Sequence, residues 1–178
     1  MDIKLHDKNF EPFLSKEIIS KAIDTISNAI SKDYQNNTPL FLGVLNGSFM
    51  FCADLLKAYN HSCEISFIKL ASYQQTESTG TVNELIGLNE DLTNRTVIIV
   101  EDIVDTGNTL EKIIALLDKQ PIKEYKVASL FLKPSVYNKT IPIDYVGLEI
   151  PNHFIVGYGL DYDGLGRNLP EVYKLKSS

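Results

Sequence analysis

Three carboxylates and a short polar turn lie together near the middle of the chain. The apolar, β-branched run 97–100 leads directly into Glu101 and Asp102, and Asp105 follows three residues later. The next four residues are small or polar: Thr106, Gly107, Asn108 and Thr109. Carboxylates accept hydrogen bonds from hydroxyl groups, and the N–H groups of a turn that opens a helix bind phosphate. This spacing predicts a site for a ligand with both hydroxyl groups and phosphate, such as a sugar phosphate.

Such a site needs a strand and a helix to hold it, and the surrounding pattern predicts both. A continuous β-branched run is typical of a buried parallel strand, and ligands of open α/β sheets bind beyond the carboxyl ends of such strands. Strands are expected over 40–45, 63–70, 96–100, 125–132 and 145–150, and helices after Ser15, after 46–48 and over 109–119. This alternation predicts an α/β fold with a parallel sheet. The chain ends fit it less well and are expected to form a separate cap.

The composition favours a single globular domain. The chain has 178 residues, of which 44% are hydrophobic and 22% charged, so it is long enough for a sizeable core. A net charge of -6 argues against broad electrostatic binding to nucleic acid or to an anionic membrane. Cys52 and Cys63 form no CxxC pair and are expected to be reduced, and no stretch approaches membrane-spanning length. These features predict a cytoplasmic enzyme.

Other common site signatures are missing. Gly157-Tyr158-Gly159 begins like a dinucleotide-binding GxGxxG motif, but Tyr162 stands where the third glycine belongs. The chain contains no P-loop motif and no GxSxG motif, and its three histidines lack metal-ligand spacing. The carboxylate motif therefore carries the functional prediction.

The complete motif, an apolar run followed by Glu-Asp-x-x-Asp-Thr-Gly-x-Thr, resembles the phosphoribosyl-pyrophosphate (PRPP) signature of type I phosphoribosyltransferases. The resemblance implies that Glu101 and Asp102 face the ribose hydroxyls and help to place Mg²⁺. It assigns the 5′-phosphate to five residues: Asp105, Thr106, Gly107, Asn108 and Thr109. It also implies one domain over 1–178, with a parallel-sheet core at about 36–145 and a small hood from about 1–14 and 146–178.

Other parts of the chain match the loops of this family that bind pyrophosphate and close over the site. Asn46 and Gly47 stand where the family keeps its pyrophosphate loop, and Lys69 and Arg167 are further candidates for pyrophosphate contacts. An exposed strand lysine is an equally good interpretation of Lys69. Ser72-Tyr73 resembles the start of the mobile loop that closes the active site. Many members carry a basic residue at the positions of Asn46 and Asn108, so an altered PRPP affinity is expected here.

The second half of the chain is similar to the purine subgroup of the family. Lys133, at the end of a strand, resembles the lysine that recognises the 6-oxo group, since an ammonium group only donates hydrogen bonds. In the run 154–162, Phe154 is expected to stack on the purine, and Ile155 to offer backbone groups to its edge. The resemblance makes Asp161 a ligand of a second Mg²⁺ that also supports the base pocket, beside Arg167. Surface or core roles would be the ordinary interpretation of each residue taken alone.

The implied reaction transfers the 5-phosphoribosyl group from PRPP to N9 of a 6-oxopurine, with Mg²⁺ as cofactor. Hypoxanthine and guanine are the expected bases, with xanthine as a further candidate, and the products are IMP or GMP and pyrophosphate. Asp105 is expected to exchange a proton near N7 of the base. The family tends to form homodimers or homotetramers. The alternative is a PRPP-sensing regulator of the same fold, which would need the phosphate turn and a basic face but no purine-reading residues.

Overall fold

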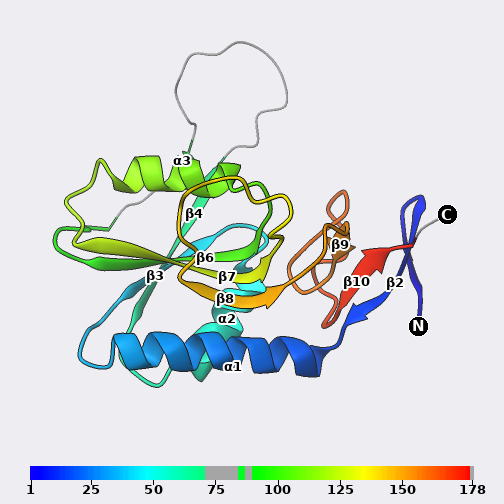
Figure 1. The fold of residues 1–178 in the computed structure, drawn as a ribbon, viewed down its shortest axis with the longest axis horizontal. Coiled ribbons are helices and arrows are strands. Elements are labelled where there is room, and N and C mark those ends of the chain that lie inside the picture. Colours follow the sequence, from blue (N-terminus) through cyan, green and yellow to red (C-terminus); the bar gives the residue numbers. More distant parts are fainter. Residues whose placement is uncertain (71–83, 87–89, 177–178) are drawn as a thin grey trace, which may run out of the picture.

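The computed structural model describes residues 1–70, 84–86 and 90–176, and Figure 1 shows its two sheets. The larger sheet has the strand order β5-β4-β3-β6-β7-β8. Its strands are β3 (Leu40–Val44), β4 (Glu64–Leu70), β5 (Glu84–Ile86), β6 (Thr96–Val104), β7 (Glu124–Leu132) and β8 (Tyr145–Glu149). All neighbours pair in parallel except β5, which is antiparallel to β4 at the edge. The α/β prediction is confirmed.

Helices cover both faces of the larger sheet. α1 (Lys16–Asp33) and α2 (Phe49–Ala58) lie on one face, and α3 (Asn108–Leu117) lies on the other (Figure 1). The central strand β6 contacts both layers: Ile98 and Val100 pack in the cluster that contains α1 and α2, whereas Ile99 packs in the cluster that contains α3. Because β6 is buried on both faces, its sequence over 97–100 is a continuous run of β-branched residues and not an alternation of apolar and polar ones.

Two details of these elements differ from the expectation. β6 continues to Val104, four residues beyond the expected end, because Glu101, Ile103 and Val104 keep their pairing with β7. Glu101 and Asp102 therefore belong to the strand itself. Ser15 occupies the N-cap of α1, but its side chain makes no capping hydrogen bond.

The chain ends form the smaller sheet, which we call the hood. Its order is β1-β2-β10-β9, and all its strand pairs are antiparallel. The strands are β1 (Ile3–Leu5), β2 (Lys8–Leu14), β9 (Ile155–Val156) and β10 (Val172–Leu175). Phe10, Val156 and Tyr173 form its own small core. The hood stands beyond the carboxyl end of β8, so it faces the edge of the sheet where a ligand is expected (Figure 1).

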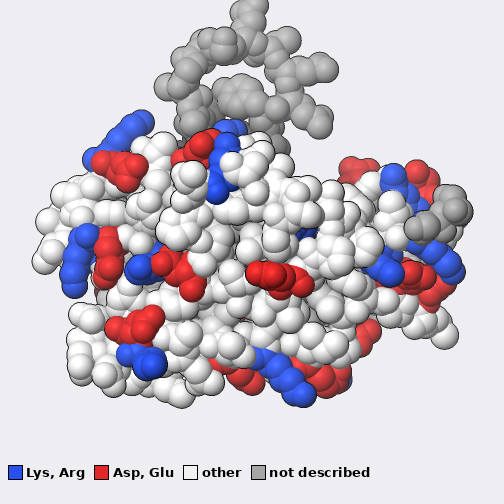
Figure 2. All heavy atoms as spheres, in the orientation of Figure 1, with Lys and Arg blue, Asp and Glu red and all other residues white. Residues whose placement is uncertain are grey.

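One face of the molecule is mixed in charge (Figure 2). On the face drawn in Figure 2, acidic and basic side chains are interspersed and do not gather into one basic area. None of the helices in the described ranges combines the length and apolar character that a membrane span requires.

Candidate active site

The two adjacent acids near the end of β6 are both buried. Glu101 is 5% exposed and Asp102 is 9% exposed. Burial raises the pKa of Glu101 well above its usual range, and the charge of Asp102 adds to this shift. Burial likewise raises the pKa of Asp102 to about 6, although its hydrogen bond from the Ile103 N–H (2.9 Å) acts in the opposite direction. A buried carboxylate pair of this kind favours a cation or hydroxyl donors at its open side.

The turn between β6 and α3 forms one wall of a pocket. Gly107 has φ +84, a backbone conformation that strongly favours glycine, and it is the N-cap of α3. The first N–H groups of a helix have no partner within it, so this turn offers donors to an anion. The pocket has a volume of about 320 Å³, and its lining includes Gly47, Glu101, Asp102 and residues 105–109.

Tyr137 and Lys139 support this turn from behind. A Cβ atom on Gly107 would meet the Tyr137 ring at 2.6 Å and Cγ of Lys139 at 2.9 Å. Lys139 also forms an ion pair with Glu111 of α3 at 2.9 Å. Neither supporting residue is predictable from the local sequence, because the segment that carries them follows β7 and is distant in sequence from the turn.

The loop 45–48, after β3, packs directly on Asp102. A Cβ atom on Gly47 would stand 1.7 Å from Asp102 Oδ2, and one on Gly159 would stand 2.0 Å from the Gly47 carbonyl oxygen. The hydroxyl of buried Ser48 donates to the Val44 carbonyl at 2.7 Å, and the Leu45–Asn46 peptide bond is cis. The loop is thus held between a core acid and a turn of the hood.

A second pocket, of about 340 Å³, lies between the core and the hood. Its lining includes five residues that sequence reasoning assigned to the base or to pyrophosphate: Lys133, Phe154, Ile155, Asp161 and Arg167. Four residues line both pockets: Gly47, Asp102, Ile103 and Asp105. The two pockets are therefore adjoining compartments of one site.

Lys133 projects into the second pocket with most of its donors engaged. It is 6% exposed, and its Nζ lies 3.1 Å from Asp105 Oδ2 and 3.3 Å from Asn152 Oδ1. An ammonium group has three N–H donors, so one remains for a ligand. Asn152 was missed by the sequence analysis; its place after β8, at the carboxyl edge of the sheet, was the available signal.

The hood contributes an aromatic ring and an ion pair to this pocket. Phe154 is 46% exposed, and its ring packs edge-on against Tyr162 with 5.8 Å between centroids. Asp161 and Arg167 form an ion pair at 2.6 Å, and Arg167 also donates to the Gly159 carbonyl at 2.6 Å. The exposed ring suits stacking on a flat heterocycle, and the arginine suits an anion.

Two predicted residues do not appear in the described lining of these compartments, and two more lie outside the part of the chain that the structure describes. Lys69 lies in β4, on the far side of β3 from β6, and it is absent from the described lining of both pockets, as is the exposed Asn46. Gly47, next to Asn46, lines both. Ser72 and Tyr73 lie outside the described residues.

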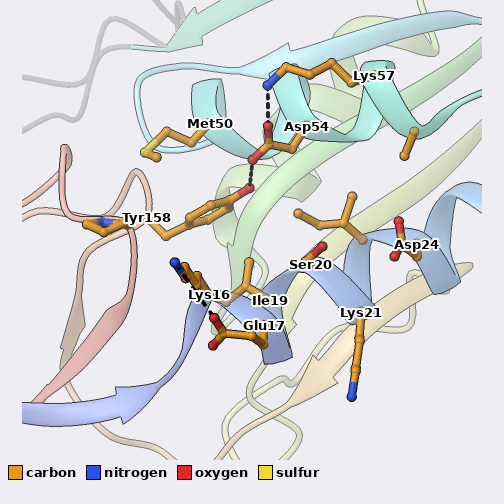
Figure 3. A pocket seen from close by; sticks show the side chains of 13 residues that line it. Lys16, Glu17, Ile19, Ser20, Lys21, Asp24, Met50, Asp54, Lys57 and Tyr158 are labelled. Atoms are coloured by element: carbon orange, nitrogen blue, oxygen red, sulfur yellow. Dashed lines mark hydrogen bonds and ion pairs between the residues drawn. The ribbon is translucent and has the colours of Figure 1, made fainter.

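A groove of larger volume, about 820 Å³, lies elsewhere, between α1 and α2 (Figure 3). Its charged side chains are largely paired with one another, as in Lys57–Asp54 and Lys16–Glu17. In the described ranges, no group of three or more His, Cys, Asp and Glu side chains is arranged to hold a metal ion by itself.

Comparisons with known proteins agree with this geometry. The family model of the phosphoribosyl transferase domain matches residues 11–163. The hypoxanthine-guanine phosphoribosyltransferase of Staphylococcus aureus is 38% identical over 173 residues, covering 97% of each chain, and that of Staphylococcus epidermidis is 41% identical over 165 residues, covering 92% of each. A crystal structure of a hypoxanthine phosphoribosyltransferase from Staphylococcus aureus superposes with a TM-score of 0.86 at 39% identity, covering 93% of this chain and 91% of that one.

Proposed function

The chain belongs to the phosphoribosyltransferase family, and we propose that it transfers the 5-phosphoribosyl group of PRPP to N9 of a 6-oxopurine. Hypoxanthine and guanine are the proposed bases, xanthine is a further candidate, and the products are IMP or GMP and pyrophosphate. The observation that carries the proposal is the pair of adjoining pockets that share Asp102 and Asp105. One has acids and a helix N-terminus for a sugar phosphate, and the other has an aromatic ring and a lysine for the base.

In the first pocket, Glu101 and Asp102 accept hydrogen bonds from the ribose 2′- and 3′-hydroxyls. The 5′-phosphate binds to the backbone N–H groups and hydroxyls of Thr106, Gly107, Asn108 and Thr109, with Asp105 at the edge of this turn. Asn108 carries no charge, so the backbone donors provide most of the binding. Pyrophosphate lies near Gly47 and Arg167, with Asn46 and Lys69 as weaker candidates for contacts.

In the second pocket, Lys133 selects the base. Two of its donors are directed to Asp105 and Asn152, and the third donates to O6 of the purine. Adenine has an amino group at that position, which is itself a donor, so it is disfavoured. Phe154 stacks on the purine face, and Ile155 offers its backbone groups to the base edge.

The donor set suits Mg²⁺, which is commonly held by one or two carboxylates together with substrate phosphates. Glu101 and Asp102 are buried hard oxygen donors, and within the described residues neither forms an ion pair. Asp161 is a further candidate, because its oxygens have lone pairs beyond those that bind Arg167 and the Gly164 N–H. When bound, the ion neutralises negative charge that develops on the leaving pyrophosphate.

The position of Asp105 supports a role in proton transfer to or from the base. It lines both pockets, and Lys133 holds its carboxylate at 3.1 Å. We propose that it accepts or returns a proton at N7 as N9 becomes nucleophilic. General acid–base help of this kind contributes about 10²–10⁴-fold to the rate. Arg167 stabilises the departing pyrophosphate electrostatically.

The regulatory alternative is not supported. The relatives that match nearly the full length are named as enzymes, and the purine-reading residues are all gathered in one pocket. The face in Figure 2 has mixed charge, whereas an RNA-binding or DNA-binding regulator needs a basic surface.

A base panel tests the proposed function. The purified chain is incubated with PRPP, MgCl₂ and, in separate reactions, hypoxanthine, guanine, xanthine or adenine, and nucleotides are separated chromatographically. We expect a nucleotide from hypoxanthine, guanine or both, and none from adenine. If none of the bases gives a nucleotide, the proposed enzymatic activity is refuted. If adenine alone gives one, the proposed role of Lys133 is refuted.

We also propose that the enzyme acts in the cytoplasm as a homodimer or homotetramer, as its family resemblance implies. Light scattering on a size-exclusion column measures the oligomeric mass directly. A monomer at micromolar concentration would contradict the oligomeric part of the proposal.

A further inference from the structure

Tyr158 connects the hood to the core at one wall of the α1–α2 groove. It lines the groove together with Met50, and its hydroxyl points toward α2, where it donates to Asp54 Oδ2 at 2.5 Å (Figure 3). The other carboxylate oxygen of Asp54 accepts from Lys57 at 2.7 Å. Tyr158 is 5% exposed, so this hydrogen bond is largely shielded from water on the tyrosine side. Burial, together with the neighbouring Asp54, raises the pKa of Tyr158, which keeps the hydroxyl protonated as a donor.

The backbone at Tyr158 needs to be held in place. Its φ is +49, in the left-handed region that residues with a side chain seldom adopt. Such conformations persist where the surroundings impose them. Here the Tyr158 N–H donates to the Leu169 carbonyl at 2.9 Å, and the hydroxyl is fixed by Asp54. The side-chain hydrogen bond is therefore one of the contacts that hold this turn to the core.

The next residue, Gly159, contacts two residues that line the second pocket, Gly47 and Arg167. Its Cα packs on the carbonyl of Gly47, since an added Cβ would lie only 2.0 Å from that oxygen. Its own carbonyl accepts from Arg167 Nη1 at 2.6 Å, and its N–H donates to the Arg167 carbonyl at 2.9 Å. A shift of the turn would therefore change the position of Arg167 relative to Gly47.

We propose that Tyr158 is a positioning residue for pyrophosphate. Its hydrogen bond to Asp54 holds the Gly159 turn against the 45–48 loop and so fixes the distance between Arg167 and Gly47. This inference rests on the proposed function, because it assigns both groups to the pyrophosphate of PRPP. The base side of the pocket depends on Lys133 and Phe154, which the turn does not carry. Loosening the turn should thus affect PRPP more than the base.

The chain offers a matched control. Tyr145 donates to Asp33 Oδ2 at 2.8 Å, and it is 8% exposed, similar to Tyr158. This pair joins β8 to the C-terminal end of α1, and in the described linings of the two site pockets neither partner appears. Removing either tyrosine hydroxyl should cost comparable stability, but only one change should alter the site.

The test compares Tyr158→Phe with Tyr145→Phe in the full chain. We expect Tyr158→Phe to raise the KM for PRPP by about three- to tenfold, the effect of one lost hydrogen bond. The KM for hypoxanthine and the melting temperature should change no more than in Tyr145→Phe. Asp54→Asn keeps an acceptor and should stay near the wild type, whereas Asp54→Ala should match Tyr158→Phe. The double variant Tyr158→Phe/Asp54→Ala should be no worse than either single variant.

Equal KM values for PRPP in the two tyrosine variants would overturn the proposal, as would additive effects of Tyr158→Phe and Asp54→Ala. Hydrogen exchange gives a readout that needs no catalysis: the Gly159 amide should exchange faster in Tyr158→Phe and not in Tyr145→Phe. If the wild type forms no nucleotide, the proposed function fails, and unchanged exchange at Gly159 would separately refute the role of Tyr158.

Discussion

Gly47 and Asp102 are in such close contact that a methyl group on Gly47 would stand 1.7 Å from the carboxylate oxygen Oδ2. The contact joins the loop after β3 to the acid pair of β6, so the expected pyrophosphate and ribose positions share one wall. Asp102 lines both pockets, and any change at Gly47 therefore reaches both compartments.

Gly47→Ala should lower kcat/KM by about 100-fold or more, since a displacement near 1 Å in a catalytic group has effects of that size. Either Asp102 or the loop must move to admit the methyl group. Steady-state kinetics with PRPP and hypoxanthine measure the loss. Gly147→Ala is the steric control: its Cβ would crowd the Leu130 carbonyl at 2.7 Å, and Gly147 belongs to β8, outside the described lining of both pockets. Similar kinetic constants for the two variants would contradict this interpretation of the contact.

Asp102→Asn should stabilise the protein without its substrates at neutral pH. The pKa of Asp102 in the folded chain is raised to about 6 from 3.8, chiefly by burial, so the folded state binds its proton more tightly than the unfolded state. The stability this proton provides is present below pH 4 and is lost as the pH rises to about 6. Asparagine does not titrate, so the variant does not lose this stability. The free energy of unfolding of the variant minus that of the wild type should therefore be about 1–3 kcal/mol larger at pH 7.5 than at pH 4.

Urea denaturation of both proteins between pH 4 and 8 checks this gain. The same variant should bind PRPP with Mg²⁺ more weakly, because the carboxylate that faces the ribose and the ion has lost its charge. If the difference in stability between the two proteins does not vary with pH, burial does not raise the pKa of Asp102 in the folded chain.

Asn152→Ala should weaken the binding of the purine base and leave the binding of PRPP unchanged. The Asn152 amide oxygen lies 3.3 Å from Lys133 Nζ and, with Asp105, directs the third donor into the pocket. Losing it should raise the KM for hypoxanthine by about three- to tenfold, the effect of a hydrogen bond that contributes about 1 kcal/mol. Asn152 is exposed, so the fold should tolerate alanine. A parallel rise in the KM for PRPP would argue for a general distortion.

Asp105→Asn should lower kcat by about 10²–10⁴-fold while PRPP still binds. Asparagine keeps an oxygen that can accept from Lys133, so the geometry of the pocket is retained, but it cannot take a proton at N7. Calorimetry with PRPP and single-turnover kinetics separate the two effects. An unchanged kcat would remove Asp105 from the mechanism.

Local patterns were sufficient to predict the central part of the site. The acids at 101–102, the turn at 106–109 and the helix after it are consecutive in sequence, so their spacing directly predicts how they lie in space. β6 was predicted too short because a pair of carboxylates looks like a strand end, whereas these acids remain paired with β7.

The contacts between distant segments were not predictable in the same way. The Lys133–Asn152 and Tyr158–Asp54 hydrogen bonds join residues 19 and 104 positions apart. Nothing in the local sequence marks Tyr158 as a contact of α2, because an isolated tyrosine in a glycine-rich segment fits many roles. Lys69 shows the opposite case: its residue type suits pyrophosphate, but its strand places it away from the described lining of both pockets.

The most direct measurement follows both products of the transfer in one sample. The purified chain is mixed with PRPP, hypoxanthine and MgCl₂, and IMP and pyrophosphate are quantified over time. We predict that the two products appear in equal amounts and only when all three components are present. Pyrophosphate without IMP, or neither product from the folded protein, would contradict the assignment of the two pockets to one two-substrate site.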